Sequence, residues 1–327
     1  MSKNEVYRAL AEQEGQCLSG QELSRRLGIS RAAVWKAVEA LRRQGCDIEA
    51  RPGSGYRLRP GDRLDRLSVE SCLSAPRDHW QVLEEVDSTN TACKRLAAEG
   101  AADGTVVMAD MQTAGKGRRG RRFVSPRGKG LYLSVLWRPE RPAEALLPLT
   151  ALAAVAACHA MERVCSAAPE IKWPNDLVLQ GKKLCGILTE MSLEGESGHV
   201  EYVVVGIGIN CRQRPEDFGP ELADMAVSLD MVLPGAVRRA ALAAALMEEL
   251  DLLRREILPR PELWLEEYRR RCLTVGRRVK ILRGQQSSEA EAVAVDESFG
   301  LTVRCDNGAV ETLHSGEVSV RGLYGYV

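Results

Sequence analysis

The sequence lacks the spacings that mark a protein-bound metal or a disulfide framework. Ten cysteines are scattered over the 327 residues with no Cys-x-x-Cys pair, and the four histidines lie far apart. Zinc sites and disulfide-rich domains depend on recognisable ligand spacings. We therefore expect reduced, mostly buried thiols and no metal held by protein histidine or cysteine.

An excess of charge and a targeting segment are also missing. Lys and Arg (45) balance Asp and Glu (45), and the first residues carry charges without the apolar core of a signal peptide. The longest apolar stretch, near 146–160, is rich in alanine and is typical of a buried helix that is too short to span a bilayer. The length predicts two or three domains. We expect a cytoplasmic globular protein with no membrane contact.

The most informative segment is a glycine-rich basic stretch in this otherwise neutral chain. Residues 114–122 read Ala-Gly-Lys-Gly-Arg-Arg-Gly-Arg-Arg, and no Asp or Glu occurs from Met111 through Pro139. Glycines let backbone N–H groups turn toward an anion while the cations supply charge. Apolar runs at 105–109 and 131–137 predict a strand on each side. The segment therefore predicts a loop that binds a phosphate-bearing small molecule; the alternative is a solvated loop or a nonspecific nucleic-acid patch.

The first sixty residues are cationic, with eleven Lys and Arg against seven Asp and Glu. Residues 19–22, Ser-Gly-Gln-Glu, form a capping-box pattern for a short helix that should close at Gly28. Ser30 should cap a second, cationic helix that Gly45 ends. Two short helices joined by a glycine-containing turn are the helix-turn-helix pattern.

A hairpin should follow these helices and supply the wing of a winged helix. Strand-like residues 48–51 and 56–58 flank Pro-Gly-Ser-Gly. The placement of Arg and Lys together with the wing favours DNA binding over a helical protein-interaction module, and residues 23–36 also resemble bacterial winged-helix repressors. A lone domain of this charge would bind DNA weakly at physiological salt, so operator binding should require a dimer. The expected DNA-binding residues are Ser30, Arg31, Ala32, Trp35, Lys36, Arg42, Arg51 and Arg57.

The central block alternates strand-like and helix-like patterns, which is typical of an α/β or α+β domain. Residues 86–90 end a strand-like run with Ser-Thr-Asn before a helix expected over Thr91–Glu99. These three are ordinary N-cap residues or, together, donors and acceptors for a neutral polar group such as a ureido ring. Residues 202–210 predict a buried strand whose glycines permit close approach of a nucleotide. They do not form a Gly-x-Gly-x-x-Gly loop, so dinucleotide binding is a poor interpretation.

A further motif, Lys-Trp-Pro-Asn-Asp at 172–176, precedes a tight hairpin whose second strand contains Lys183. The lysine stem can pack in that strand while its ammonium reaches a ligand carboxylate or phosphate; a surface hairpin lysine is the alternative. Beyond about Thr274, short and closely spaced strands with an Asp-Asn-Gly turn predict a small barrel.

Together these motifs resemble one family, the biotin–protein ligases, and specifically the bifunctional biotin ligase and biotin-operon repressor. The winged helix, Ser-Thr-Asn, the basic loop, Lys-Trp-Pro-Asn-Asp, Lys-Leu-Cys-Gly-Ile-Leu and Gly-Ile-Gly-Ile-Asn occur in the family's order over essentially the whole chain. The resemblance implies an α+β multidomain fold. Its parts are a winged helix-turn-helix domain at 1–63, a mixed α/β catalytic domain of the biotin/lipoate ligase type at 64–272 and an SH3-like small β-barrel at 273–327.

The resemblance also implies the reaction. Biotin is activated by ATP, accompanied by Mg²⁺, to biotinyl-5'-adenylate, and the biotinyl group passes to a lysine of the biotin carboxyl carrier protein domain of a carboxylase. The adenylate-bound homodimer would bind operator DNA and repress biotin synthesis genes. One alternative, a ligand-sensing repressor without ligase turnover, is disfavoured by the retention of Lys183 and the complete basic loop. Another, a lipoate-type ligase, is disfavoured by the Lys-Gly-Arg-Arg-Gly-Arg spacing.

The same resemblance assigns roles to individual residues. The catalytic residues are Lys183, Arg118 and Asp176, with Mg-ATP near Asp176. The biotin-binding residues are Ser88, Thr89, Asn90, Gln112, Gly115, Lys116, Gly117, Arg118, Lys183 and Gly186. The adenylate- and ATP-binding residues are Arg118, Arg119, Arg121, Phe123, Lys172, Trp173, Asn175 and Asn210. Three residues depart from the family's common pattern, namely Lys116 for arginine, Phe123 for tryptophan and Val227 for threonine.

Overall fold

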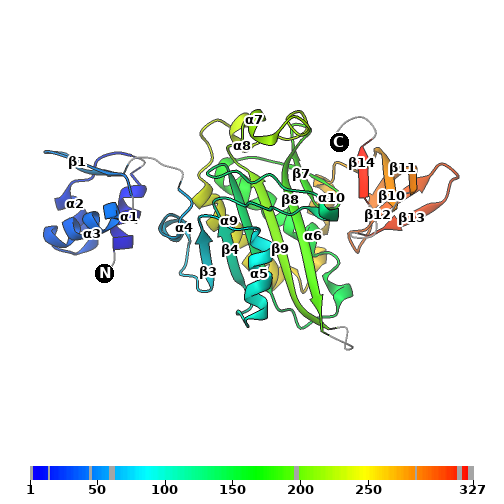
Figure 1. Cartoon of the computed structure of the whole chain (residues 1–327), viewed down its shortest axis with the longest axis horizontal. Helices are drawn as coiled ribbons and strands as arrows, with labels where there is room; N and C mark the ends of the chain where they lie inside the picture. The colour runs from blue at the N-terminus through cyan, green and yellow to red at the C-terminus, as the bar shows by residue number, and fades with distance from the viewer. Residues whose placement is uncertain are drawn as a thin grey trace.

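The protein is built of three parts that follow one another along an elongated molecule (Figure 1). The computed structural model describes residues 3–13, 15–43, 46–58, 63–194, 199–283, 286–314 and 319–322. Small helices and a hairpin lie at one end, a seven-stranded mixed sheet with its helices lies in the middle, and a five-stranded sheet lies at the other end.

The N-terminal part has the predicted helix-turn-helix and wing. Its elements are α1 (Lys3–Ala11), α2 (Gly20–Leu27), α3 (Arg31–Arg43) and an antiparallel hairpin of β1 (Ile48–Arg51) and β2 (Gly55–Leu58). The Ser19 hydroxyl accepts from the Glu22 backbone N–H, and Gly28 closes α2 in the left-handed region at φ 64°. Both predictions are confirmed. The Ser19 hydroxyl satisfies a backbone N–H that has no partner within the helix, and glycine adopts the left-handed conformation at little cost in free energy because it has no Cβ. The expected helix end at Gly45 lies outside the described residues.

The core of this part comes from the apolar positions of α3. Val34, Val38 and Leu41 are fully buried and contact Leu23 of α2 in one cluster. Their spacing at i, i+4 and i+7 places them on one face of the helix. The opposite face of α3 is therefore free to carry cations to the surface.

The central sheet has the strand order β3-β4-β5-β9-β8-β7-β6. Strands β3 and β4 are parallel and the remaining neighbours are antiparallel. The strands are β3 (Trp80–Leu83), β4 (Thr105–Ala109), β5 (Gly130–Trp137), β6 (Glu170–Lys172), β7 (Asp176–Leu179), β8 (Lys182–Leu193) and β9 (Val200–Asn210). The sequence thus predicted β4, β5 and β9 and the hairpin of β7 with β8, and the basic loop joins β4 to β5 as expected.

Helices cover both faces of this sheet (Figure 1). Helix α5 (Thr89–Ala98) packs on one face, while α6 (Leu149–Cys165) and α9 (Arg239–Leu252) pack on the other. Helix α5 begins at Thr89 rather than at the predicted Thr91, because Ser88 has the extended backbone of the N-cap. The remaining helices are α4 (Arg66–Cys72), α7 (Pro215–Phe218), α8 (Leu229–Val232), α10 (Leu265–Arg271), η1 (Arg118–Gly120), η2 (Ala143–Leu146), η3 (Leu253–Ile257) and η4 (Pro261–Trp264).

Helix α6 explains the long apolar stretch of the sequence. The segment Ala143–Cys165 is long and apolar enough to cross a membrane by length and composition, yet 78% of its most apolar window is buried inside the protein. It packs against α9 and the sheet, so the prediction of a buried core helix is confirmed. The prediction that the stretch is too short to span a bilayer is wrong, because the helical segment extends beyond the apolar run at both ends. Seven of the ten cysteines are buried as well, several of them in this core.

The C-terminal part is an antiparallel sheet with the order β13-β12-β11-β10-β14. Its strands are β10 (Arg278–Arg283), β11 (Gln286–Val295), β12 (Leu301–Cys305), β13 (Val310–Leu313) and β14 (Ser319–Gly322). The predicted small barrel is not confirmed, because β13 and β14 are the two edges and no ladder joins them among the described strands. The buried face of this sheet continues the central core.

Candidate functional site

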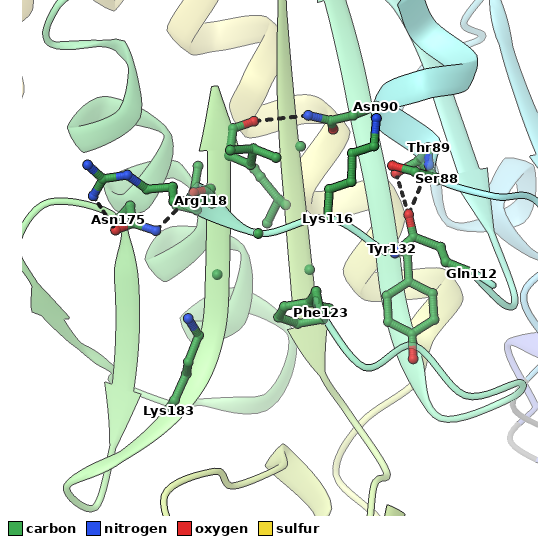
Figure 2. Close-up of a pocket in the computed structure, with 17 residues that line it drawn as sticks. Ser88, Thr89, Asn90, Gln112, Lys116, Arg118, Phe123, Tyr132, Asn175 and Lys183 are labelled. Atoms are coloured by element: carbon green, nitrogen blue, oxygen red, sulfur yellow. Dashed lines mark hydrogen bonds between the residues drawn. The ribbon is translucent and has the colours of Figure 1, made fainter. Parts of the chain in front are cut away.

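A pocket lies above three adjacent strands of the central sheet, β5, β9 and β8 (Figure 2). The strand register sets two rows across its floor, Ser134–Gly206–Leu188 and Tyr132–Gly208–Gly186. Residues two apart on a strand point to the same face, so these rows form one surface. The pocket is lined by Ser88, Thr89, Asn90, Gln112, Lys116, Gly117, Arg118, Phe123, Tyr132, Asn175, Lys183, Gly186, Ile187, Leu188, Gly206, Ile207 and Gly208.

The floor glycines make room for two side chains of the protein itself. A Cβ on Gly206 would lie 1.9 Å from Asn90 Oδ1, and a Cβ on Gly208 would lie 2.7 Å from the Phe123 ring. The sequence predicts that these glycines admit a nucleotide. In the structure they admit an amide and an aromatic ring, which then form the walls of the pocket.

A buried hydrogen-bond network occupies the end of the pocket beside α5 (Figure 2). Gln112 Oε1 accepts from the backbone N–H of Thr89 at 2.9 Å and from its hydroxyl at 3.2 Å. Gln112 Nε2 donates to Ser125 Oγ at 2.8 Å, and the Ser125 hydroxyl donates to the Phe123 carbonyl at 3.0 Å. Ser134 Oγ lies 2.7 Å from Thr89 Oγ1. The hydroxyls and amides expected at this end are therefore brought together as a rigid polar wall.

Asn90 connects this network to an ion pair. Its Nδ2 donates to Glu190 Oε2 at 2.9 Å and to the Leu188 carbonyl at 3.3 Å, while its Oδ1 accepts from Ser134 Oγ at 2.6 Å. Glu190 also accepts from Lys94 Nζ at 2.5 Å. Burial raises the pKa of Glu190, but hydrogen bonds from Lys94 and Asn90 outweigh burial and leave that pKa below its ordinary value. Glu190 is consequently an ionised acceptor at neutral pH.

Cations and amides gather at the other end of the pocket. Lys183 Nζ donates to Asp176 Oδ1 at 2.7 Å, and Asn175 Nδ2 donates to the same oxygen at 3.1 Å. Arg118 Nη1 donates to Asn175 Oδ1 at 3.0 Å. Burial lowers the pKa of Arg118 from its ordinary value and Asp176 opposes that effect, but a guanidinium stays charged at neutral pH. This end therefore presents two cations, suited to an anionic group.

The basic loop crosses from one end to the other. Gly115 has no room for a Cβ, which would lie 2.4 Å from the Phe123 carbonyl oxygen. The Gly117 N–H donates to the Arg121 carbonyl at 2.8 Å, and Arg119 has φ 56° in the turn between them. Lys116, Gly117 and Arg118 thereby face the pocket. Arg119 and Arg121 are exposed and do not belong to its lining.

Other expected residues lie outside the pocket lining. The backbone N–H of Trp173 donates to Thr274 Oγ1 and its indole N–H donates to the Phe299 carbonyl, each at 3.0 Å, so this side chain joins the central and C-terminal parts. Lys172 is buried. Asn210 accepts from Gln213 Nε2 at 3.1 Å and donates to the Val227 carbonyl at 3.1 Å, which ties β9 to the segment before α8.

The sequence interpretation missed several residues that shape the site, chiefly Ser134, Glu190, Lys94, Ser125 and Tyr132. Ser134 is a fully buried hydroxyl inside the apolar run of β5, and an interrupted apolar run is a signal that the sequence carries. Glu190 lies four residues after Gly186 on one strand, which places both on one face. Lys94 and Ser125 gave no comparable signal.

The residues expected to meet DNA lie at the start of α3, along α3 and on the β1–β2 wing. Ser30 Oγ accepts from the Ala33 N–H at 3.2 Å at the start of the helix. Arg31, Ala32 and Lys36 are exposed, and Trp35 is 55% exposed. The remaining cations have partners or half-buried positions, since Arg42 pairs with Glu39, Arg51 pairs with Glu49, and Arg57 lies half-buried in the wing.

Three family models match consecutive parts of the chain. The HTH domain model matches residues 3–57, and the Biotin/lipoate A/B protein ligase family model matches residues 82–210. The Biotin protein ligase C terminal domain model matches residues 274–321. The order and extent of these matches follow the three parts of the fold.

Known proteins are similar to this chain over nearly their full length. The Bifunctional ligase/repressor BirA of Bacillus subtilis is 33% identical, covering 97% of this chain and 98% of its own. The protein of that name from Escherichia coli is 31% identical, covering 94% of each chain. The solved structure of the Biotin protein ligase from Aquifex aeolicus in complex with biotin and ATP superposes with a TM-score of 0.64 at 29% identity, covering 75% of this chain and all of that one. The chain therefore belongs to the biotin protein ligase family, and it carries the helix-turn-helix domain of the bifunctional ligase/repressors.

Proposed function

We propose that this protein activates biotin with ATP and transfers the biotinyl group to a lysine of a biotin carboxyl carrier domain. The observation that carries the proposal is the two-ended pocket. One end is a polar wall of hydroxyls and amides, and the other holds Lys183 and Arg118 beside Asn175 and Asp176. Biotin is a bicyclic urea with a carboxylate tail. Its urea matches the polar wall, and its carboxylate, once joined to a nucleotide phosphate, matches the cationic end.

In the first step a carboxylate oxygen of biotin attacks the α-phosphorus of ATP, and pyrophosphate leaves with the electrons of the broken P–O bond. Negative charge accumulates on the phosphoryl oxygens, so fixed cations lower the barrier if they contact that charge more strongly in the transition state. Lys183 is assigned to the reacting carboxylate and phosphate, and Arg118 to the phosphate. The Lys183–Asp176 bond of 2.7 Å holds the ammonium in place before the reaction.

ATP enters as its Mg²⁺ complex, and Mg²⁺ prefers oxygen ligands from one or two carboxylates and the substrate phosphates. Asp176 supplies a carboxylate of this kind beside Lys183, so the residues present fit the ion. When bound, Mg²⁺ neutralises charge on the phosphates.

In the second step the amine of the carrier lysine attacks the acyl carbon and AMP leaves. The amine must first lose a proton, and Asp176 is assigned to orient it or to accept that proton. The basic loop, including Arg119 and Arg121, is assigned to close over the adenylate and exclude water until the carrier arrives. We also assign four residues to the side of the site that binds the nucleotide, namely Phe123, Trp173, Lys172 and Asn210.

Ligase activity is tested by incubating the purified protein with biotin, Mg-ATP and an apo-carrier domain and following the carrier by mass spectrometry. We expect a mass gain of one biotinyl group that depends on both small molecules. A protein that binds biotin and ATP but never modifies the carrier would instead be a ligand-sensing repressor. A carrier modified equally well with lipoate in place of biotin would point to the lipoate-type reaction.

The helix-turn-helix part supports a second function, repression of biotin synthesis genes. The exposed face of α3 presents Arg31, Trp35 and Lys36 beside the β1–β2 wing. We assign the adenylate-bound form to a homodimer that binds operator DNA through paired winged helices, in competition with the carrier protein. Sedimentation and DNA-binding measurements with and without biotin plus ATP test this coupling; equal dimerisation and DNA affinity in both states would contradict it.

A further inference from the structure

We propose that Glu190 and Ser125 are positioning residues that lock two pocket amides, Asn90 and Gln112, each in one orientation. The pocket would then present the Asn90 oxygen as an acceptor and select a ligand that donates a ring N–H group to it, as a cyclic urea does. This inference rests on the proposed function, because it explains how the polar wall would prefer biotin to a carboxylic acid whose ring lacks N–H groups. The pocket lining itself does not include Glu190 or Ser125.

The first lock acts on Asn90. An ionised carboxylate can only accept hydrogen bonds, so the side of the amide that faces Glu190 at 2.9 Å must be the NH₂ group. The second hydrogen of that group points at the Leu188 carbonyl, which is also an acceptor. Asn90 Oδ1 is consequently turned toward Ser134 and lies directly above Gly206 on the pocket floor. Lys94 supports the lock because its ion pair keeps Glu190 ionised.

The second lock acts on Gln112. The Ser125 hydroxyl donates its single proton to the Phe123 carbonyl at 3.0 Å, so Ser125 Oγ can only accept from the Gln112 amide at 2.8 Å. Gln112 Oε1 is thereby turned to Thr89, whose backbone N–H donates to it. Without Ser125 only the bonds from Thr89 would hold the amide in this orientation.

The oxygen of Asn90 keeps capacity for a ligand. A carbonyl oxygen accepts two hydrogen bonds, and within the network Asn90 Oδ1 receives one, from Ser134. Gln112 Oε1 already receives two, from the Thr89 N–H at 2.9 Å and the Thr89 hydroxyl at 3.2 Å, and so orients Thr89, whose hydroxyl contacts Ser134 Oγ at 2.7 Å. All of these residues are at least nine-tenths buried, so a ligand that fails to donate would leave a buried acceptor position on Asn90 unmatched.

The test measures the equilibrium affinity of the full-length protein for biotin and for its two cyclic carbamates, in which one or the other ring N–H is replaced by oxygen. Each carbamate has almost the same shape as biotin but turns one donor into an acceptor. We expect the wild type to bind at least one carbamate about tenfold or more weakly than biotin, the size of a buried hydrogen bond lost. A wild type that binds biotin and both carbamates equally would overturn the inference.

Variants separate positioning from folding. In Glu190→Gln the side chain can donate as well as accept, so we expect about tenfold weaker biotin binding and a several-fold smaller preference for biotin over the carbamate, with ATP affinity and kcat at saturating biotin unchanged. Glu201→Gln is the matched control, since Glu201 is exposed on β9 and accepts from Ser192. If Glu190→Gln does not fold, Ser125→Ala provides the same comparison through Gln112.

The outcomes separate a failure of the proposed function from a failure of this inference alone. A wild type that fails to bind biotin at all would overturn the proposed function and this inference together. A wild type that binds biotin, with Glu190→Gln and Ser125→Ala variants that keep both the affinity and the preference over the carbamates, would overturn only the inference.

Discussion

Arg118 Nη1 donates to Asn175 Oδ1 at 3.0 Å, which joins the basic loop to the turn before β7 (Figure 2). The two residues are 57 positions apart, and Asn175 in turn donates to Asp176 and to the Ile187 carbonyl. The loop is therefore anchored at its midpoint to the end of the pocket that holds Lys183. An arginine in this position can hold the loop closed and contact a phosphate in the same region.

The Arg118→Gly variant should release biotinyl-adenylate prematurely, because the loop loses both its anchor and a charge-assisted hydrogen bond. We expect the rate of adenylate escape to rise about tenfold or more, the range for a lost bond to a charged group. Adenylate appearing in the filtrate without carrier, together with biotin on unrelated proteins, measures this. Arg127→Gly is the control, since Arg127 pairs with Glu85 at the surface. An escape rate equal to that of the control would argue against the anchor.

Lys183 and its neighbour Lys182 offer a paired test of the cationic end. Lys183 lines the pocket and bonds Asp176, whereas Lys182, one residue earlier on β8, points its side chain to the opposite face. Lys183→Ala should slow biotin-dependent ATP–pyrophosphate exchange by about 100- to 1000-fold, as for removal of one preorganised transition-state contact. Lys182→Ala should change it little. Equal effects of the two substitutions would show that general charge, and not placement, matters.

The elements that the sequence predicted correctly are those specified by neighbouring residues. Caps such as Ser19 and Gly28, the periodicity of α3 and the apolar runs of β4 and β5 all act within one turn or one strand. The sequence places the start of α5 two residues too late because Ser88, Thr89 and Asn90 can all cap a helix, and only the tertiary bonds of Thr89 and Asn90 select Ser88.

The features that sequence reasoning missed depend on long-range contacts. Closure of the C-terminal sheet would require its edges β13 and β14 to pair, which short strand lengths do not specify. Trp173 turns to Phe299, 126 residues away, and no local pattern predicts that partner. Glu190 meets Asn90 across 100 residues of chain. The motif residues of the pocket were found from sequence, and the residues that orient them were not.

His159 predicts a specific dependence of stability on pH. Its Nε2 lies 2.9 Å from Glu267 Oε2 and its Nδ1 lies 3.4 Å from Glu249 Oε2, which links α6 to α10 and α9. The hydrogen bond to Glu249 raises the pKa of His159, burial opposes it, and Glu267 adds to the rise. The bound proton thus favours the folded state. This stabilisation is complete below the pKa of an unfolded histidine, about 6.5, and is lost as pH rises through the higher folded-state pKa.

The measurement is the thermal unfolding temperature as a function of pH. The difference between wild type and His159→Gln should be largest below pH about 6.5 and should shrink as the pH rises above it. His79→Asn is the control, because His79 is exposed and has φ 56°, a conformation that asparagine tolerates. A constant difference across this range would mean that His159 contributes by packing against Trp264 rather than by its charge.

Lys36 provides a test of the proposed DNA-binding face. It is exposed on α3 next to Trp35. A lysine that contacts a phosphate releases a counterion on binding, so Lys36→Ala should weaken binding to every sequence and reduce the slope of log affinity against log salt by about 1 for each bound subunit. Arg304→Ala, in an exposed ion pair of the C-terminal sheet, is the control. An unchanged salt slope would place Lys36 away from the DNA backbone.

Gly206 sets the depth of the pocket, and its replacement by alanine should damage biotin binding more than folding. An added Cβ would lie 1.9 Å from Asn90 Oδ1, so the amide must move away from Ser134 and Glu190. We expect the KM for biotin to rise about tenfold or more because Asn90 loses its orientation, while the KM for ATP stays close to the wild-type value. Gly20→Ala is the control: its Cβ would meet Tyr56 at an ordinary 3.6 Å. Parallel increases in both KM values, with a lower unfolding temperature, would show that Gly206 serves the packing of the sheet and not the orientation of Asn90.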